Sequence, residues 1–437
     1  MLISQAKIVN EGKVVEADVL VKGQHIAKIA PFIAAPPRTR VLDAKGKLLL
    51  PGVIDDQVHF RDPGFPAKGD IASESAAAVA GGTTSFMDMP NTDPKTVTRE
   101  LLAAKYASAD KRAHANYAFY FGATNDNLEE IKALKHGDAC GVKVFMGAST
   151  GNMLVDDPAT LENIFRHCPL LVATHCEDTP TIKALEAAAR EKYGEDVPAA
   201  EHANIRPVEC CYKSSALAVS LARKHGANLH VLHLTTAKEL ELFTPDDPRV
   251  TAEACVHHLF LNEKAYAKLG HRAKCNPSIK TEADRKALVE AVKSGRITLI
   301  ATDHAPHTAE EKAQSYFKAP SGLPVIQHSL LMMLELVARG ELDLKTVVQR
   351  MCHAPAQRFG VKDRGYVREG GYADLVLVDP KTPTMVTKES LLYRCGWSPF
   401  EGTEFSHSIA STWVNGELAW DGKQVVHKPH GKRLEFL

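Results

Sequence analysis

The chain has 437 residues, 44% of them hydrophobic and 24% charged, which is typical of a globular protein with a large core. Basic and acidic residues both total 53, so the zero net charge argues against a nucleic-acid-binding or anionic-membrane-binding protein. The apolar runs are too short to span a bilayer, and we see no signal peptide or CxxC pair. We expect a cytoplasmic protein with reduced thiols.

Both ends of the chain read as short strands joined by tight turns. Apolar and polar residues alternate between residues 7 and 30, and strand-like runs recur at 374–378 and 411–415. The turn signals are the dipeptides Glu11-Gly12, Lys22-Gly23 and Asn415-Gly416. We therefore expect residues 1–52 and 358–437 to form one composite, β-sandwich-like domain.

The middle of the chain alternates between strands and helices. Eight apolar runs have β character, namely residues 52–59, 83–89, 116–121, 141–146, 170–174, 229–234, 250–256 and 297–302. Helical stretches lie between them, for example residues 73–80, 160–166, 214–224 and 283–292, and a polar insertion covers residues 191–206. This α/β pattern predicts a (β/α)₈ TIM barrel over residues 53–357. The rival doubly wound sheet lacks its usual marker, a glycine-rich loop after the first strand.

Polar residues stand at or near the ends of five of these runs. In such a barrel, catalytic side chains project from the carboxyl ends of the strands. The five residues are His59, Lys143, His175, His233 and Asp303. A lone histidine at a strand end is more often structural, but imidazole and carboxylate groups converging from separate strands are what a divalent transition metal requires. The joint pattern therefore predicts a metal centre.

Lys143 is unusual because it lies inside an apolar strand, GVKVFMG. A buried lysine is costly unless it is paired, neutralised or modified. One interpretation is an ion pair with Asp88 or Glu253, which also occupy strand positions. The other is a group that bridges metal ions.

Several motifs together resemble those of dihydroorotases, a cyclic amidase branch of the amidohydrolase superfamily. Residues 51–64 (PGVIDDQVHFRDPG) resemble the first signature of that family, and residues 301–307 (ATDHAPH) resemble the second. Between them, the segments 89–92, 174–177, 233–236 and 276–277 follow in the family's order. The resemblance covers nearly the whole chain, including the split β-domain.

The resemblance implies reversible hydrolysis of (S)-dihydroorotate to N-carbamoyl-L-aspartate, a step of pyrimidine biosynthesis. Lys143 would be N-carboxylated and would bridge two metal positions. His175 and His233 would hold one Zn²⁺, and His59 and Asp303 would hold the other. Zinc lowers the pKa of its bound water to about 7, and Asp303 would serve as general base and then as general acid.

The resemblance also implies a substrate-binding set of Arg61, Asn91, Asn276 and His307. The planar fork of Arg61 suits a carboxylate, which dihydroorotate carries and simple hydantoins and dihydropyrimidines lack. We therefore expect a small-molecule substrate with a carboxylate. Enzymes of this type often form dimers, so a homodimer is expected.

Gln57 departs from the family pattern, because it stands where the first signature has a histidine. An amide oxygen is a weak ligand for zinc compared with imidazole. Three interpretations stay open. In the first, one metal held tightly by Lys143, His175 and His233 is enough for activity. In the second, Gln57, or water held by it or by Asp56, completes a two-metal site. In the third, the chain is a catalytically inactive homologue.

The rival functions follow from the same residues. One is another cyclic amidase, such as an allantoinase or a hydantoinase-like enzyme, and the other is a non-catalytic dihydroorotase-like partner. His257, His258 and His304 are expected to support or pack behind the site. The polar stretch 149–152 follows the strand of Lys143 and is a candidate loop over the site.

Overall fold

The computed structural model describes residues 1–147, 153–245, 247–426 and 428–437. The candidate loop at 149–152 lies outside these residues. No helix within the described ranges has the length and apolar character needed to cross a bilayer.

All eight predicted apolar runs form parallel strands. The strands are β6 (Val53–Val58), β7 (Thr83–Asp88), β8 (Asn116–Phe119), β9 (Phe121–Gly122), β10 (Val142–Phe145), β11 (Val172–His175), β12 (Leu229–Val231), β13 (Val250–Cys255) and β14 (Leu299–Ala301). They form a three-stranded sheet, β6-β7-β8, and a six-stranded sheet, β14-β13-β12-β11-β10-β9. The third predicted run supplies both β8 and β9, with Tyr120 between them. The α/β class with parallel strands is therefore confirmed.

The two parallel sheets meet at both margins, through a hydrogen bond at one and through the continuous chain at Tyr120 and Phe121 at the other. At one margin the backbone N–H of His59 donates to the carbonyl of His304 at 2.7 Å. At the other, Tyr120 N–H donates to the Asp88 carbonyl at 3.0 Å, and Phe121 N–H donates to the Gly141 carbonyl at 3.0 Å. The carboxyl ends of strands from both sheets therefore face one region.

The predicted helices are present, and local sequence explains where they begin and end. They are α1 (Ile71–Ala80), α4 (Pro158–His167), α7 (Val208–His225) and α10 (Glu282–Ser294). Asp70 accepts a hydrogen bond from Ser73 N–H at the start of α1, and Thr281 caps α10 in the same way. Gly226 and Gly295 end α7 and α10 in the left-handed conformation.

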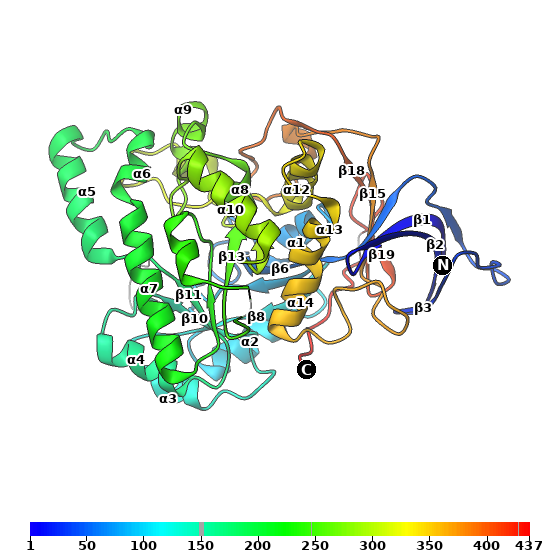
Figure 1. The fold of residues 1–437 in the computed structure, drawn as a ribbon, viewed down its shortest axis with the longest axis horizontal. Coiled ribbons are helices and arrows are strands. Elements are labelled where there is room, and N and C mark those ends of the chain that lie inside the picture. The colour runs from blue at the N-terminus through cyan, green and yellow to red at the C-terminus, as the bar shows by residue number, and fades with distance from the viewer. Residues whose placement is uncertain (148–152, 246, 427) are drawn as a thin grey trace.

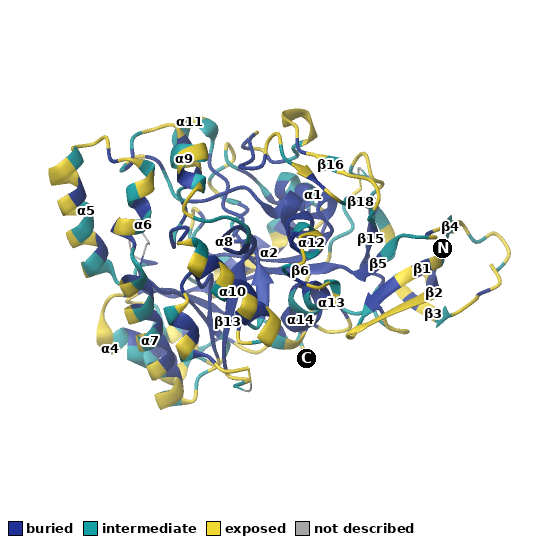
Figure 2. Ribbon diagram, turned by 45° about the horizontal axis from the view of Figure 1, so that its top comes forward, coloured by how far each residue is buried: buried dark blue, intermediate teal, exposed yellow. Residues whose placement is uncertain are grey.

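The insertion after β11 forms further helices before α7 begins. They are α5 (Thr179–Tyr193) and the short α6 (His202–Ile205), and they stand at the edge of the molecule beside α7 (Figure 1). Remaining helices include α2 (Arg99–Ala109), α3 (Leu128–Lys132), α8 (Val256–Phe260), α9 (Ala265–Leu269), α11 (Ala309–Lys312), α12 (Ser329–Ala338), α13 (Leu344–Val348) and α14 (Ala354–Phe359). Figure 2 shows the parallel strands as buried and the outer faces of helices such as α5 and α10 as exposed.

The two ends of the chain share one eight-stranded sheet, drawn in blue and in orange to red in Figure 1. Its strands are β1 (Leu2–Asn10), β2 (Lys13–Lys22), β3 (His25–Ala30), β4 (Val41–Asp43), β5 (Leu48–Pro51), β15 (Leu375–Asp379), β18 (Ser408–Val414) and β19 (Glu417–Trp420). β5 joins the two segments, pairing in parallel with β1 and antiparallel with β15. Asn415 and Gly416 form the predicted turn, both at positive φ. The division into two domains stays a prediction.

Candidate metal centre and substrate cavity

A cavity of about 370 Å³ lies at the carboxyl ends of the parallel strands. Its wall contains all ten residues singled out from the sequence, namely Gln57, His59, Arg61, Asn91, Lys143, His175, His233, Asn276, Asp303 and His307. The structure thus brings together residues that the chain separates by up to about 250 positions. Their individual roles stay predictions.

His175 and His233 form the first half of the cavity floor. Nδ1 of His175 lies 2.9 Å from Nε2 of His233. Nε2 of His175 lies 2.8 Å from the Glu177 carboxylate, which only accepts, so the ring proton sits on Nε2 and leaves the Nδ1 lone pair directed at His233. Burial is the largest cause that lowers the pKa of both imidazoles, and neutral imidazole is the form that binds metals.

Glu177 is itself held by a second partner. Nη1 of Arg206 donates to its Oε2 atom at 2.6 Å. Burial opposes ionisation of Glu177, but Arg206 and His175 outweigh it and hold the pKa of the carboxyl below its ordinary value. A fixed carboxylate behind a histidine sets the ring orientation and tautomer that a metal ligand needs.

Lys143 is buried beside this pair, and burial lowers its pKa to about 8. Asp88, one of its two expected partners, instead forms an ion pair with Lys105 at 2.6 Å. Among the described residues, no carboxylate oxygen lies within 4.0 Å of the Lys143 amine, although the charges of Asp303 and Glu253 favour its protonated form. An ion pair with Asp88 is therefore excluded as the reason for this lysine.

His59 and Asp303 form the second half of the cavity floor. Nδ1 of His59 lies 2.8 Å from Oδ1 of Asn91, and Nε2 of the same ring lies 3.1 Å from Oδ1 of Asp303. Gln57 approaches the same Asp303 oxygen, and its amide Nε2 donates to it at 3.1 Å. The oxygen of the Gln57 amide is turned toward the Cys255 thiol, at 3.8 Å.

The two halves differ in how well they fit a metal ion. Zinc–nitrogen bonds of about 2.0–2.1 Å place two nitrogens of a tetrahedral site roughly 3.3 Å apart, close to the spacing of His175 and His233. The first half fits an ion. At the second half, Gln57 points N–H groups at the carboxylate, and a donor directed there repels a cation. In this arrangement the amide oxygen of Gln57 is turned away from Asp303.

Three cavity residues have left-handed backbone conformations that non-glycine residues rarely adopt. They are Arg61 at φ 68°, His233 at φ 41° and Asp303 at φ 48°. Each such residue costs of order 1–3 kcal/mol, and such costs gather at functional sites. The surrounding structure therefore holds these side chains in place at a cost to stability.

Arg61 and His307 form a polar wall of the cavity. Nη2 of Arg61 lies 3.0 Å from Nε2 of His307, and Nε donates to the Pro306 carbonyl at 3.1 Å. The amine of Lys68 lies 3.1 Å from the other ring nitrogen of His307. Burial, and then the charges of Arg61 and Lys68, hold the pKa of His307 well below its ordinary value, so the ring is neutral. This wall is suited to an anion.

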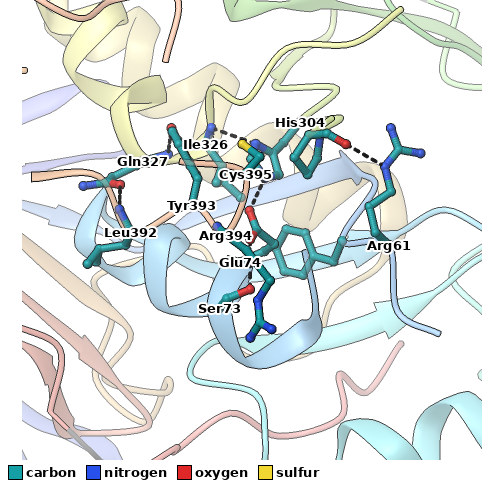
Figure 3. A network of polar contacts seen from close by, with 12 residues as sticks. Arg61, Ser73, Glu74, His304, Ile326, Gln327, Leu392, Tyr393, Arg394 and Cys395 are labelled. Carbon is teal, nitrogen blue, oxygen red and sulfur yellow. Dashed lines mark hydrogen bonds and ion pairs between the residues drawn. The ribbon is translucent and has the colours of Figure 1, made fainter. Parts of the chain in front are cut away.

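His304 supports the cavity from behind, as the sequence indicated. Its Nε2 lies 2.7 Å from the buried Glu74 carboxylate, and its Nδ1 accepts from Val325 N–H at 3.0 Å. Figure 3 shows this network continuing through Glu74 to Arg394, whose backbone N–H donates to Glu74 at 3.1 Å. The C-terminal segment also reaches the cavity directly, because Trp397 donates to the His307 carbonyl at 2.7 Å.

The sequence did not single out several cavity residues. Arg206 and Glu186 come from the insertion after β11, and Lys274 and Tyr316 come from loops. The amine of Lys274 donates to the Tyr316 carbonyl at 2.6 Å and to the Ala319 carbonyl at 2.8 Å. Glu177, which contacts His175 and does not line the cavity, had a usable signal in its position two residues after His175.

Comparison with known proteins identifies the family. Residues 48–419 match the model of the amidohydrolase family. A dihydroorotase of Pyrococcus abyssi is 32% identical over 99% of this chain and 98% of its own length. An allantoinase of Bacillus velezensis is 32% identical over 96% of this chain and 94% of its own. The L-hydantoinase (dihydropyrimidinase) structure from Arthrobacter aurescens superposes with a TM-score of 0.94 at 28% identity, covering 99% of both chains. The chain therefore belongs to the amidohydrolase family and is a hydrolase.

Proposed function

We propose that the chain is a cyclic-amide hydrolase of the dihydroorotase type, which interconverts (S)-dihydroorotate and N-carbamoyl-L-aspartate. We also propose that its two parallel sheets form one closed (β/α)₈ barrel around the cavity. The observation that carries the proposal is the cavity itself, in which the His175–His233 pair and the Arg61–His307 wall lie together. The histidine pair suits a metal ion at the reacting amide, and the Arg61–His307 wall suits a ring carboxylate.

Asp303 has the properties required of a proton carrier. Burial opposes its ionisation, but the hydrogen bond and charge of His59 outweigh burial and hold the pKa of Asp303 below its ordinary value. The carboxylate is thus ready to accept a proton from the attacking water and to deliver it to the leaving ring nitrogen. His59 and Gln57 fix its position through the same oxygen atom.

The metal is proposed to be one Zn²⁺ held by His175, His233 and Lys143. When bound, such an ion polarises the ring carbonyl and lowers the pKa of a water molecule to about 7. Lys143 is proposed to be N-carboxylated, which removes the cost of its buried ammonium group. Its pKa of about 8 leaves part of the amine unprotonated near neutral pH, as carboxylation requires.

The substrate is proposed to meet Arg61, His307, Asn91 and Asn276. The Oδ1 atom of Asn91 is committed to His59, so its amide N–H groups are the part that can donate to a substrate. Asn276 lines the same cavity. These donors favour a ring with a carboxylate over allantoin or simple hydantoins, which are the substrates of the second candidate function.

Turnover of purified, zinc-loaded protein on dihydroorotate, allantoin and hydantoin tests the proposal. We expect dihydroorotate to be preferred in kcat/KM by about 100-fold or more, because charge-assisted hydrogen bonds discriminate by roughly 1.5–3 kcal/mol each. A preference for allantoin or hydantoin would make the chain another cyclic amidase. A metal-loaded protein without any turnover would be the non-catalytic partner.

The homodimer and the cytoplasmic location are further parts of the proposal. Sedimentation of the purified protein tests the first, and fractionation of source cells tests the second.

A further inference from the structure

A second cluster of metal-ligand side chains lies outside the cavity, enclosed by the parallel strands. Asp56 of β6, His230 of β12 and Glu253 of β13 have no exposed surface. Nε2 of His230 lies 3.1 Å from Oε2 of Glu253 and 3.6 Å from Oδ2 of Asp56. One ligand atom from each of the three residues lies within 4.8 Å of the other two. The strands thus bring two carboxylates and one imidazole together in the protein interior.

The hydrogen bonds around His230 determine which of its nitrogens carries the proton. The hydroxyl of Thr251 donates to the Leu229 carbonyl at 3.3 Å, so its oxygen is left to accept from Nδ1 of His230, 2.8 Å away. Neutral His230 is therefore protonated on Nδ1, and the bare Nε2 lone pair faces two carboxylates. Three electron-rich atoms in contact require a positive species between them.

A proton on His230 is a poor candidate for that species. A proton on Nε2 would serve Glu253 at 3.1 Å but would leave Asp56, at 3.6 Å, beyond hydrogen-bond distance. Asp56 has no hydrogen-bond donor for either oxygen among the described residues. Burial, and then the charge of Glu253, raise its pKa well above the ordinary value. A proton shared between the Asp56 and Glu253 carboxyl groups is the remaining alternative to a metal ion.

The separations match those of ligands on one ion. Zinc bonds of about 2.0–2.2 Å to nitrogen and oxygen place tetrahedral ligands roughly 3.3 Å apart, between the two measured separations from His230. The contact of Nδ1 with Thr251 leaves Nε2 as the ring nitrogen that faces the two carboxylates. We propose that Asp56, His230 and Glu253 hold a structural divalent transition-metal ion, with Zn²⁺ as the best match, separate from the ion in the cavity.

Two neighbouring groups are consistent with this site. The hydroxyl of Tyr120 is buried without a hydrogen-bond partner among the described residues. Burial raises its pKa well above the ordinary value, and Cys140, Asp56 and Glu253 raise it further. The second oxygen of Glu253 accepts from the backbone N–H of His233 at 3.1 Å. An ion in the interior would therefore steady the backbone of a cavity histidine without touching the substrate.

Metal content of the zinc-loaded full-length protein tests the proposal after removal of loosely bound ions. Asp56→Asn keeps the shape of the side chain but removes the charge, and it should lower the zinc content by about one ion per chain. Glu239→Gln is the matched control, because Glu239 is an equally buried carboxylate with hydrogen bonds from Ser215 and Thr236. His175→Ala should lose the cavity ion and keep the interior one, so the two sites are counted separately.

Anomalous diffraction from wild-type crystals at the zinc edge provides a measurement that needs no variant. The expected result is a peak within about 2.2 Å of Nε2 of His230 and of both carboxylates. Absence of that peak in a protein carrying zinc in the cavity would overturn the proposal and assign the position to a proton. An unchanged zinc content in folded Asp56→Asn would overturn it equally.

Discussion

The two halves of the cavity floor use similar residues but differ in what surrounds them. His175 and His233 direct ring nitrogens at one another, and Glu177 and Arg206 hold His175 from behind. His59 and Asp303 also approach within 3.1 Å, but Gln57 donates a hydrogen bond into the same carboxylate oxygen. The first half is arranged for a cation. In the second half, Gln57 and His59 already contact the carboxylate of Asp303.

This difference shows that residue type alone does not define a metal site. Both halves contain good zinc ligands. They differ because Gln57 directs its amide nitrogen, a donor, and not its oxygen at the second half. The same carboxylate that is poorly placed to share a second ion is well placed as a proton carrier.

The largest effect should come from the first half. His175→Ala should remove the cavity zinc and lower kcat/KM by at least about 1,000-fold, because the ion supplies most of the charge stabilisation. His59→Ala should retain the cavity zinc. Metal analysis beside steady-state kinetics on both variants checks this, and loss of zinc from His59→Ala alone would reverse the assignment.

Lys143→Met should abolish turnover while making the metal-free protein more stable. Because the pKa of Lys143 is about 8 in the folded protein and 10.5 in the unfolded chain, the unfolded chain binds more protons than the folded protein between these pH values. Burial of the lysine therefore destabilises the fold fully below pH 8, and less as the pH rises toward 10.5. The variant should gain up to about 3 kcal/mol at pH 7, and the gain should shrink as pH rises through the window. Denaturant titrations at pH 7 and pH 10.5 measure it, and a gain independent of pH would contradict it.

Arg61→Ala should weaken the substrate wall without disturbing the metal. We expect kcat/KM for dihydroorotate to fall by about 10- to 100-fold, mainly through KM, because a charge-assisted hydrogen bond to the carboxylate is lost. Zinc content should stay at the wild-type value, which serves as the control. A normal KM would show that another group binds the carboxylate.

The smallest change should come from Gln57→His. Replacing the amide with an imidazole removes its hydrogen bond to Asp303 and adds a ligand to the second half, so the zinc content should rise by about one ion per chain. Gln57→Glu is the matched variant, because it keeps the shape of the side chain and replaces the amide nitrogen with an oxygen that can bind zinc. An unchanged zinc content in both variants would mean that Gln57 is not what limits the second position.

The sequence predicted the strands and the cavity residues well because both depend on local patterns. Apolar runs ended by polar residues placed His59, Lys143, His175, His233 and Asp303 in one cavity. The direction in which the Gln57 amide points depends on Asp303, which lies 246 positions away, and no local pattern encodes it.

The supporting residues were missed for the same reason. Arg206 reaches Glu177 from an insertion whose path is set by packing. Asp56 meets His230 and Glu253 only when strands of the two parallel sheets come together. The backbone conformations of Arg61, His233 and Asp303 are also products of the assembled fold.

Zinc-edge anomalous diffraction of the wild-type enzyme compares the two halves of the cavity most directly. We expect a strong peak between Nδ1 of His175 and Nε2 of His233, and none between His59 and Asp303. A peak of equal or greater height at His59 and Asp303 would contradict it.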